Sequence, residues 1–246
     1  MFRFKQFSVK NEGAAFKVGT DAVLLGAALT LPSGNNLRIL DAGTGTGIIS
    51  LMVAQRLWGS NIIDFKLTAI DYDSDAVVEA AENFKESPWG NNLEIKKLSL
   101  LEFEKRMINA PKRFNLIISN PPYFENSLLN PDQKKRMARH TTENGLSWRT
   151  LMAFSEAFLA PGGRLAMILP VDSSPAATGS LELRRLIEIR TTPAKPVSRI
   201  IVEYEKPGLE NSVPAESLIK EELTVLENGS YSRQYLSLTK DFHLFI

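Results

Sequence analysis

The sequence predicts an α/β fold in which helices pack on a mostly parallel sheet. Short apolar runs alternate with segments of helical periodicity along most of the chain, which is the pattern of βαβ units. A glycine-rich loop separates the first of these runs from a helical segment, as in many open α/β sheets. A length of 246 residues, with 43% hydrophobic and 23% charged residues, is enough for one such domain with a sizeable core.

Six apolar runs of strand length are predicted as strands, at residues 37–41, 66–71, 93–97, 114–119, 163–169 and 198–203. Helical patterns are found at residues 20–29, 48–57, 74–85, 147–159 and 180–190, with Ser74 and Ser147 as predicted N-caps. Near the end of the chain, residues 218–226 and 231–245 predict two more strands, or a strand and a short helix, at an antiparallel edge of the sheet.

The composition excludes several classes of site. The chain has no cysteine, so disulfides, thiol nucleophiles, iron–sulfur clusters and Cys-ligated zinc are ruled out. With His140 and His243 as the only histidines, we expect no metal centre. The start of the chain does not resemble a signal peptide, and the apolar stretch at 22–31 is much shorter than the roughly 20 residues of a membrane span. We therefore expect a cytoplasmic protein with no membrane partner.

The glycine-rich loop predicts a cofactor site. Asp41, Gly43 and Gly45 belong to a strand–loop–helix segment with the spacing G-x-G-x-G, which is neither the G-x-G-x-x-G of dinucleotide enzymes nor a P-loop. The next strand ends in Asp71, followed by Tyr72, and an acidic residue there can accept hydrogen bonds from both hydroxyls of a ribose. Together these residues predict an adenosine-containing cofactor.

A second motif, Asn120-Pro121-Pro122-Tyr123, follows the buried strand at 114–119. It resembles the [DNS]-P-P-[YF] motif of S-adenosylmethionine-dependent methyltransferases that act on planar amide or amino nitrogens. The prolines fix their φ angles and lack N–H donors, so the turn offers carbonyl acceptors in a rigid geometry and biases Asn120 towards an extended conformation. We expect the Asn120 amide and the Pro121 carbonyl to accept the two hydrogens of an amino group, and Tyr123 to stack on a flipped base.

Further stretches extend the resemblance over nearly the whole chain. Residues 2–7, 18–27, 136–140, 162–170 and 231–244 are similar to the bacterial tRNA1(Val) adenine-37 N6-methyltransferase family. The resemblance implies a class I methyltransferase Rossmann-like fold, with a mostly parallel seven-stranded sheet whose last strand is antiparallel. It also implies S-adenosyl-L-methionine as the cofactor, tRNA as the partner, and methylation of adenine N6 next to the anticodon.

The same resemblance implies one domain and assigns roles to residues within it. Residues 1–246 would form a monomeric unit, with a cap segment (1–35), a cofactor-binding and catalytic core (36–170) and a part that completes the sheet (171–246). The implied cofactor-binding residues are Gly19, Thr20, Asp21, Asp41, Gly43, Gly45, Asp71, Tyr72, Ser99, Leu100 and Asn120. Of these, Gly19–Asp21 would close over the methionine end. Ser99 or the Leu100 backbone stands where such enzymes commonly carry an aspartate that binds the adenine.

A basic segment follows the catalytic turn. Four fixed positive charges, Lys134, Lys135, Arg136 and Arg139, precede His140, and we expect this segment to contact tRNA phosphates. The net charge of +1 argues against a uniformly basic nucleic-acid binder, but it combines this segment with an acidic tail at 201–246, which has 4 Lys/Arg and 8 Asp/Glu.

Three alternatives remain open. A protein-glutamine N5-methyltransferase acting on a release factor presents a similar NH2 group to the turn, although such enzymes usually carry an N-terminal helical domain. A guanine N2-methyltransferase would more often have Phe at position 123. A non-catalytic RNA-binding module of the same fold would be expected to lose the catalytic turn, which is intact in this sequence.

Overall fold

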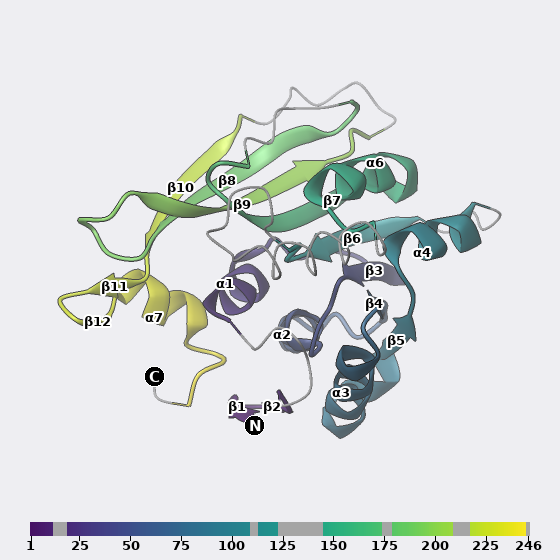
Figure 1. The fold of residues 1–246 in the computed structure, drawn as a ribbon, viewed down its shortest axis with the longest axis horizontal. Coiled ribbons are helices and arrows are strands. Elements are labelled where there is room, and N and C mark those ends of the chain that lie inside the picture. Colours follow the sequence, from purple (N-terminus) through teal and green to yellow (C-terminus); the bar gives the residue numbers. More distant parts are fainter. Residues whose placement is uncertain (12–18, 109–112, 123–144, 174–178, 209–216, 245–246) are drawn as a thin grey trace, which may run out of the picture.

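In the computed structural model, which describes residues 1–11, 19–108, 113–122, 145–173, 179–208 and 217–244, eight strands form a central sheet (Figure 1). In spatial order they are β10 (Ile219–Thr224), β8 (Glu182–Arg190), β9 (Val197–Glu205), β7 (Leu159–Pro170), β6 (Phe114–Ser119), β3 (Leu37–Ala42), β4 (Phe65–Asp71) and β5 (Leu93–Lys97). All neighbours are parallel except those of β9, the seventh of these strands in the chain. The mostly parallel sheet is confirmed, and β10 extends the predicted seven strands by one.

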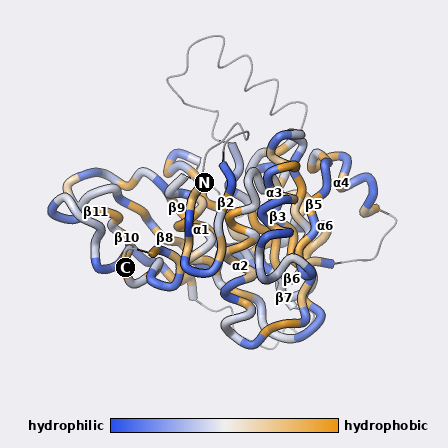
Figure 2. Tube along the Cα trace, turned by 90° about the horizontal axis from the view of Figure 1, so that it is seen from below, coloured by the Kyte–Doolittle hydropathy of each residue, from blue (hydrophilic) through white to orange (hydrophobic). Residues whose placement is uncertain are grey.

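Helices cover both faces of this sheet. One face packs against α1 (Thr20–Ala28), α2 (Ile48–Gly59), α3 (Ser74–Glu86) and α7 (Arg233–Thr239), and the other against α4 (Leu100–Met107) and α6 (Trp148–Phe158). Successive strand residues point to opposite faces, so Ile39 belongs to the first core and Leu40 to the second. Figure 2 shows hydrophobic stretches in the middle of the molecule, where the central strands lie. Strands buried on both faces explain the continuous apolar runs of the sequence.

Four of the five predicted helices begin within one residue of the predicted position. Ser147 caps α6, and its side chain accepts a hydrogen bond from the Thr150 N–H in a capping box. For α3 the N-cap is Asp73, not Ser74, and its carboxylate accepts from the Asp75 N–H. Helix α4, which the sequence reading missed, begins with a capping box between Ser99 and Glu102.

The predicted helix at 180–190 is wrong, because this segment forms β8 between β9 and β10. The error has a physical cause. Leu183 lies opposite Tyr204 and Arg185 opposite Glu203, so Arg184 is an extra residue in a β-bulge. The bulge returns Leu183 and Leu186 to the same face, and their spacing of three then resembles a helix.

The tail forms a strand and a short helix, which is one of the two alternatives predicted from the sequence. Strand β10 lies at the edge of the sheet, but it pairs with its neighbour in parallel and not antiparallel as predicted. Strand β9 ends at the amino edge of the parallel strands, so the next strand runs back in their direction and pairs with β8 in parallel. A small hairpin of β11 (Leu226–Glu227) and β12 (Ser230–Tyr231) then leads into α7.

The two ends of the chain lie side by side (Figure 1). The N-terminal hairpin of β1 (Phe2–Arg3) and β2 (Ser8–Val9) contacts the C-terminal turn, where Phe4 and His243 form a β-bridge. His243 is buried, and its Nε2 lies 3.1 Å from the Tyr235 hydroxyl. His243 is thus a packed residue. Between α3 and β5 the chain forms a short 3-10 helix (Gly90–Asn92).

None of the helices in the described part of the chain is both long enough and apolar enough to cross a bilayer.

Candidate functional site

The predicted motifs leave the sheet at one edge, because β3 is the parallel neighbour of both β4 and β6. In these ladders Asp41 lies opposite Ala69 of β4 and Ile118 of β6, so the three strands end almost level. The glycine loop at 43–47, the residues after Asp71 and the turn at 120–122 therefore all emerge beside one another. Ligands of open α/β sheets bind at this edge, beyond the carboxyl ends of the strands.

The glycine loop needs its glycines for two different reasons. Gly43 has a φ of +70°, and a Cβ on it would lie 2.4 Å from Leu146 Cδ2, so the chain packs too closely here for a side chain. Gly45 has a φ of +57°, and a Cβ on it would meet no atom of the described residues within 4 Å. The described part of the chain therefore leaves room for a ligand to approach the backbone at Gly45 closely.

Asp71 fixes this loop to the end of β4. Its Oδ2 accepts a hydrogen bond from the Gly45 N–H at 2.8 Å, and its Oδ1 accepts from the Asp73 N–H at 3.0 Å. Burial raises the pKa of Asp71 above its usual value, although both backbone bonds favour the charged form. Each carboxylate oxygen has a second lone pair, so Asp71 can still accept hydroxyl donors. Tyr72, which follows it, is partly buried.

Asp41 is completely buried, and only one of its two carboxylate oxygens has hydrogen-bond partners among the described residues. Its Oδ2 accepts hydrogen bonds from the hydroxyls of Thr44 and Ser50, both at 2.7 Å. Its Oδ1 has no hydrogen-bond partner among the described residues. Burial, with a smaller contribution from the charge of Asp71, raises the pKa of Asp41 to about 6. A buried carboxylate oxygen without a donor is costly, and a ligand with a positive charge or an N–H group would compensate it.

The turn at 120–122, which the sequence predicts to be catalytic, starts from a buried point of the sheet. Asn120 is partly buried, Pro121 is buried and Pro122 is partly buried. Before them, the Ser119 hydroxyl donates a 2.7 Å hydrogen bond to the Ala42 carbonyl of β3. The remaining turn residue, Tyr123, lies outside the described residues. So do the residues predicted to contact RNA, Lys134, Lys135, Arg136, Arg139 and His140.

The start of α1 reaches the same edge. Gly19 is the N-cap of this helix and Thr20 its first residue, and both are exposed. The Asp21 carboxylate accepts a 2.9 Å hydrogen bond from Arg199 Nε. In the β7–β9 ladder Arg199 lies opposite Pro170, the last residue of β7, which places the ion pair at the carboxyl end of that strand. The sequence reading missed Arg199, because the two partners are 178 positions apart and no local pattern links them.

Ser99 and Leu100 lie at the end of β5, where the adenine contact was predicted. The Ser99 hydroxyl accepts from the Glu102 N–H and donates to the Glu102 carboxylate, and both residues 99 and 100 are buried. Ser99 thus has a capping role in addition to any contact with a cofactor. The S-x-x-E spacing at 99–102 is a local signal that could have revealed this role.

Other residues that the sequence reading missed support the loop from outside. Thr44 and Ser50 hold Asp41, and Leu146 packs on Gly43. On the far side of the loop, the Asn83 amide donates to the carbonyl of Thr46 and joins the backbone of Lys10, which connects the N-terminal segment to the loop. The contacts of Leu146 and Asn83 join segments that are distant in the sequence.

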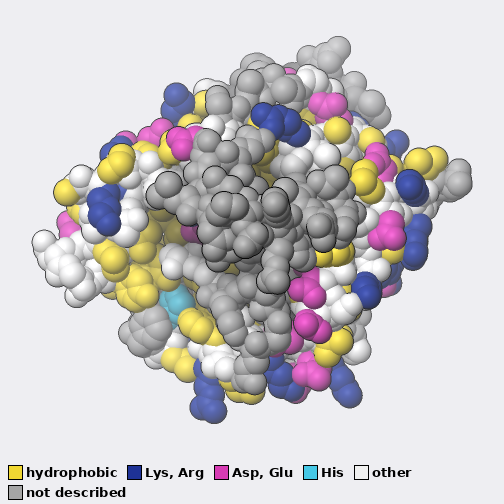
Figure 3. Space-filling model, viewed as in Figure 1, with side chains coloured by type: hydrophobic (Ala, Val, Ile, Leu, Met, Phe, Trp, Pro, Cys, Tyr) yellow, Lys and Arg dark blue, Asp and Glu magenta, His cyan; other side chains and the backbone are white. Residues whose placement is uncertain are grey.

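Among the described residues on the face shown in Figure 3, charged side chains of both signs occur at several separate places. Among the described residues, no cluster of three or more acidic or histidine side chains has an arrangement that could hold a metal ion. The described part of the site offers carboxylates and backbone groups that can hydrogen-bond to a ligand.

Comparisons with known proteins agree with this geometry. Residues 14–175 match the model of the methyltransferase small domain family. A relative from Parabacteroides distasonis is 39% identical over 99% of this chain and 97% of its own length. Relatives from Bacteroides fragilis (36% identity) and Photobacterium profundum (37% identity) also cover 99% of this chain, and 97% and 98% of their own lengths. All three are named tRNA1(Val) (adenine(37)-N6)-methyltransferase.

Solved structures support the fold. A predicted O-methyltransferase from Agrobacterium tumefaciens has a TM-score of 0.62 and 19% identity, and the match covers 90% of this chain and 96% of that one. A protein from Listeria monocytogenes, described as a class I S-adenosylmethionine-dependent methyltransferase, has a TM-score of 0.57 and 16% identity, covering 89% of this chain and 65% of that one. The predicted class I methyltransferase fold is confirmed.

Proposed function

We propose the function of this chain from its family. The chain belongs to the methyltransferase small domain family and to the family of tRNA1(Val) (adenine(37)-N6)-methyltransferases. The chain transfers a methyl group from S-adenosylmethionine to the N6 amino group of adenine 37 in tRNA1(Val). The glutamine alternative is not favoured, because the relatives that cover the whole chain share the tRNA name.

The observation that carries the proposal is the position of Asn120 beside the glycine loop. Strands β3 and β6 are direct neighbours, so the turn that would hold the amino group starts next to the loop that would hold the methyl donor. Bringing two reactants together in this way accounts for much of the rate enhancement of a transfer reaction.

We assign the cofactor to the carboxyl edge of the sheet, beside Asp41, Gly43, Gly45 and Asp71. The residues fit it in three respects: no described residue fills the space beside Gly45, Asp41 Oδ1 lacks a donor among the described residues, and the Asp71 carboxylate has more lone pairs than the two that Gly45 and Asp73 use. When bound, the cofactor supplies an electrophilic methyl group on a sulfonium ion. Gly19, Thr20, Asp21, Tyr72, Ser99 and Leu100 belong to the same proposal.

The chemistry of the turn requires acceptors rather than a strong base. The lone pair of an adenine amino group is delocalised into the ring, so this nitrogen is a weak nucleophile. We assign the Asn120 amide oxygen and the Pro121 carbonyl as acceptors for its two hydrogens, which directs the lone pair at the methyl group and stabilises charge as the bond forms. Pro122 keeps the turn rigid, and Tyr123 provides the stacking surface.

A methylation assay tests the function. Purified protein with labelled S-adenosylmethionine is expected to methylate tRNA1(Val) that lacks the modification, and digests should contain N6-methyladenosine at position 37. A parallel reaction contains a release factor as the methyl acceptor. Label on the release factor alone, or on neither acceptor, would contradict the proposal.

Cofactor binding is expected to depend on pH through Asp41. Its pKa of about 6 in the free protein means that the carboxyl is largely protonated below this pH. A positively charged cofactor favours the carboxylate, so affinity should rise by up to about tenfold per pH unit between roughly pH 5 and 6 and level off above pH 7.

For folding, the sign is opposite: the raised pKa of Asp41 makes the free energy of unfolding fall as pH rises from about 4 to about 6.

Calorimetric titrations with S-adenosylmethionine at pH 5.5, 6.5 and 7.5 would measure this dependence. Asp41→Asn cannot titrate, so its dissociation constant should vary much less over the same range. An identical pH profile for wild type and Asp41→Asn would contradict the assignment of Asp41 to the cofactor.

We also propose that the basic segment binds tRNA phosphates, on the basis of its charge and its place after the catalytic turn. Replacing Lys134, Lys135, Arg136 and Arg139 by Gln should raise the KM for tRNA. It should also make tRNA binding depend less on salt. The logarithm of the association constant falls linearly with the logarithm of the salt concentration, and each lost phosphate contact makes this slope shallower by about 0.9. A filter-binding series in KCl would measure both effects. An unchanged slope would rule out phosphate contacts by this segment.

The remaining parts of the proposal concern the whole chain. Residues 1–246 act as one monomeric domain, divided into a cap segment (1–35), a core (36–170) and a part that completes the sheet (171–246). The contact between Phe4 and His243, which joins the first and last parts, supports this division of a single unit. A tRNA substrate favours the cytoplasm as the place of action.

A further inference from the structure

One hydrogen bond joins the two strands of the site beyond the end of their backbone ladder. The paired residues of β3 and β6 end with Asp41 and Ile118. In the next position the Ser119 hydroxyl donates to the Ala42 carbonyl at 2.7 Å, and Ser119 is completely buried. The side chain thus extends the connection between the strands by one residue.

This bond lies where the two functional segments begin. Ala42 directly precedes Gly43 of the cofactor loop, and Ser119 directly precedes Asn120 of the catalytic turn. The turn is stiff, because Pro121 and Pro122 fix their φ angles. A small rotation at Ser119 would therefore move Asn120 and the Pro121 carbonyl together.

The reaction is sensitive to such a movement. Methyl transfer needs the nitrogen and the methyl carbon to approach to about 3–3.5 Å in line, and a misplacement of about 1 Å can cost about 10²-fold in rate. The cofactor loop has its own anchors on the other side, where the N–H groups of Gly43 and Thr44 donate to the Ile70 carbonyl and Gly45 donates to Asp71. The Ser119 side chain connects the start of the catalytic turn to this anchored loop.

We propose that Ser119 is a positioning residue that sets the distance between the amino group held by Asn120 and the methyl group held at the glycine loop. This inference rests on the proposed function. It assigns Ser119 an effect on kcat, and little effect on cofactor affinity, because the loop anchors at Ile70 and Asp71 do not involve this hydroxyl.

Three variants separate the hydroxyl from the volume of the side chain. Ser119→Ala removes the donor, Ser119→Cys keeps a similar volume with a weak donor, and Ser119→Thr keeps the hydroxyl in a residue type that suits a strand. We expect kcat to fall by about tenfold or more in the Ala and Cys variants, since one hydrogen bond at a fixed geometry is lost, and to stay within about threefold in the Thr variant. The Kd of S-adenosylmethionine should change less than about threefold in all three.

Ser155→Ala is the matched control. Ser155 is also a completely buried serine, but it lies on α6 and its hydroxyl has no hydrogen-bond partner among the described residues. Its loss should leave kcat unchanged. If the Ala variant fails to fold, the Cys and Thr variants still compare a weak with a strong donor. Equal kcat for wild type and both the Ala and Cys variants, or a parallel loss of cofactor affinity, would overturn the proposal.

Crystal structures of the wild type and the Ser119→Ala and Ser119→Thr variants with S-adenosylmethionine test the inference without any tRNA. We expect the Asn120 amide to shift relative to the methyl carbon in the Ala variant and to keep its place in the Thr variant. An unmoved Asn120 in the Ala variant overturns the inference whatever the substrate is. A shifted Asn120 together with a wild-type enzyme that does not methylate tRNA supports the inference and overturns only the proposed function.

Discussion

Replacing Asn120 by alanine is expected to lower kcat by about 10²- to 10³-fold, the usual cost of losing one preorganised polar group that acts in the transition state. The amide oxygen is assigned as one of only two acceptors for the amino hydrogens, and no base takes over its role. The Kd of S-adenosylmethionine should rise by no more than about fivefold, because at most one hydrogen bond to the cofactor is lost. Single-turnover methylation and calorimetric titration measure the two effects separately.

Two variants make this result specific. Asn120→Asp keeps an acceptor oxygen and remains within the [DNS]-P-P-[YF] pattern, so it should recover part of the rate. Asn115→Ala is the matched control on the same strand, where the Asn115 side chain accepts a hydrogen bond from the Arg38 N–H at the opposite end of β6. It should lower stability slightly and leave kcat unchanged. Full activity of Asn120→Ala would remove Asn120 from the mechanism.

The sequence is most informative where a local pattern and the fold agree. The parallel strands are buried on both faces, so their apolar runs are visible without any partner, and all six predicted strands are present in the sheet. Strand β8 was not predicted from the sequence, because its bulge at Arg184 breaks the alternation of side chains that identifies a strand. The parallel pairing of β10 was missed because it depends on the direction in which β9 ends, which no pattern within β10 reports.

The residues of the site also divide into those that a local sequence pattern predicts and those that it does not. The G-x-G-x-G loop and Asn120 each follow a strand and Asp71 ends one, so the rule that ligands bind at the carboxyl edge was enough to predict that they lie together. The contacts that hold these residues in place were not predictable, because they connect distant segments through single side chains. The pair of Asp21 and Arg199 and the bond from Ser119 to Ala42 are two examples.

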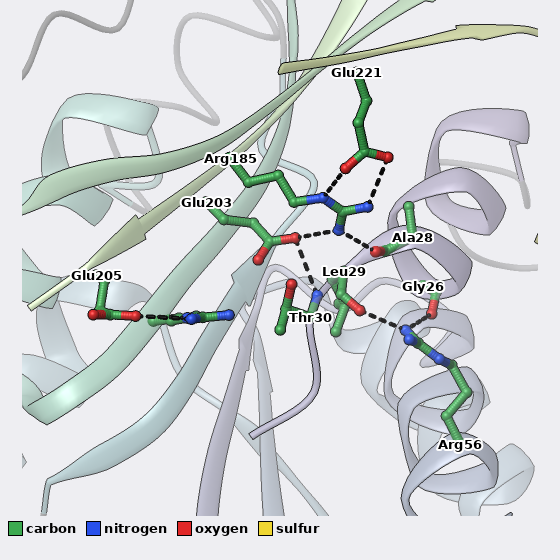
Figure 4. A network of polar contacts seen from close by, with 10 residues as sticks. Gly26, Ala28, Leu29, Thr30, Arg56, Arg185, Glu203, Glu205 and Glu221 are labelled. Atoms are coloured by element: carbon green, nitrogen blue, oxygen red, sulfur yellow. Dashed lines mark hydrogen bonds and ion pairs between the residues drawn. The ribbon is translucent and has the colours of Figure 1, made fainter. Parts of the chain in front are cut away.

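The ion pair of partly buried Arg185 with buried Glu203 is another such contact, and it is expected to carry a large part of the stability (Figure 4). Glu203 is 1% exposed and accepts hydrogen bonds from Arg185 at 2.9 Å and from the Thr30 N–H at 3.0 Å. Arg185 also donates to the Ala28 carbonyl at the end of α1, where the carbonyls of a helix lack partners within the helix. Arg56 binds two further carbonyls of this helix end, those of Gly26 and Leu29.

Arg185→Met should therefore destabilise the protein by about 3–5 kcal/mol, because it leaves the Glu203 carboxylate buried without its ion-pair partner. Glu221→Gln is the control: this second partner of Arg185 is 43% exposed, and its loss should cost no more than about 1 kcal/mol. In the double variant Arg185→Met/Glu203→Gln neither charge of the pair is left, so part of the loss in the single variant should be recovered. Urea unfolding of the four proteins measures these differences. If Arg185→Met costs no more than the control, the pair does not stabilise the packing of α1 against the β8–β9 side of the sheet.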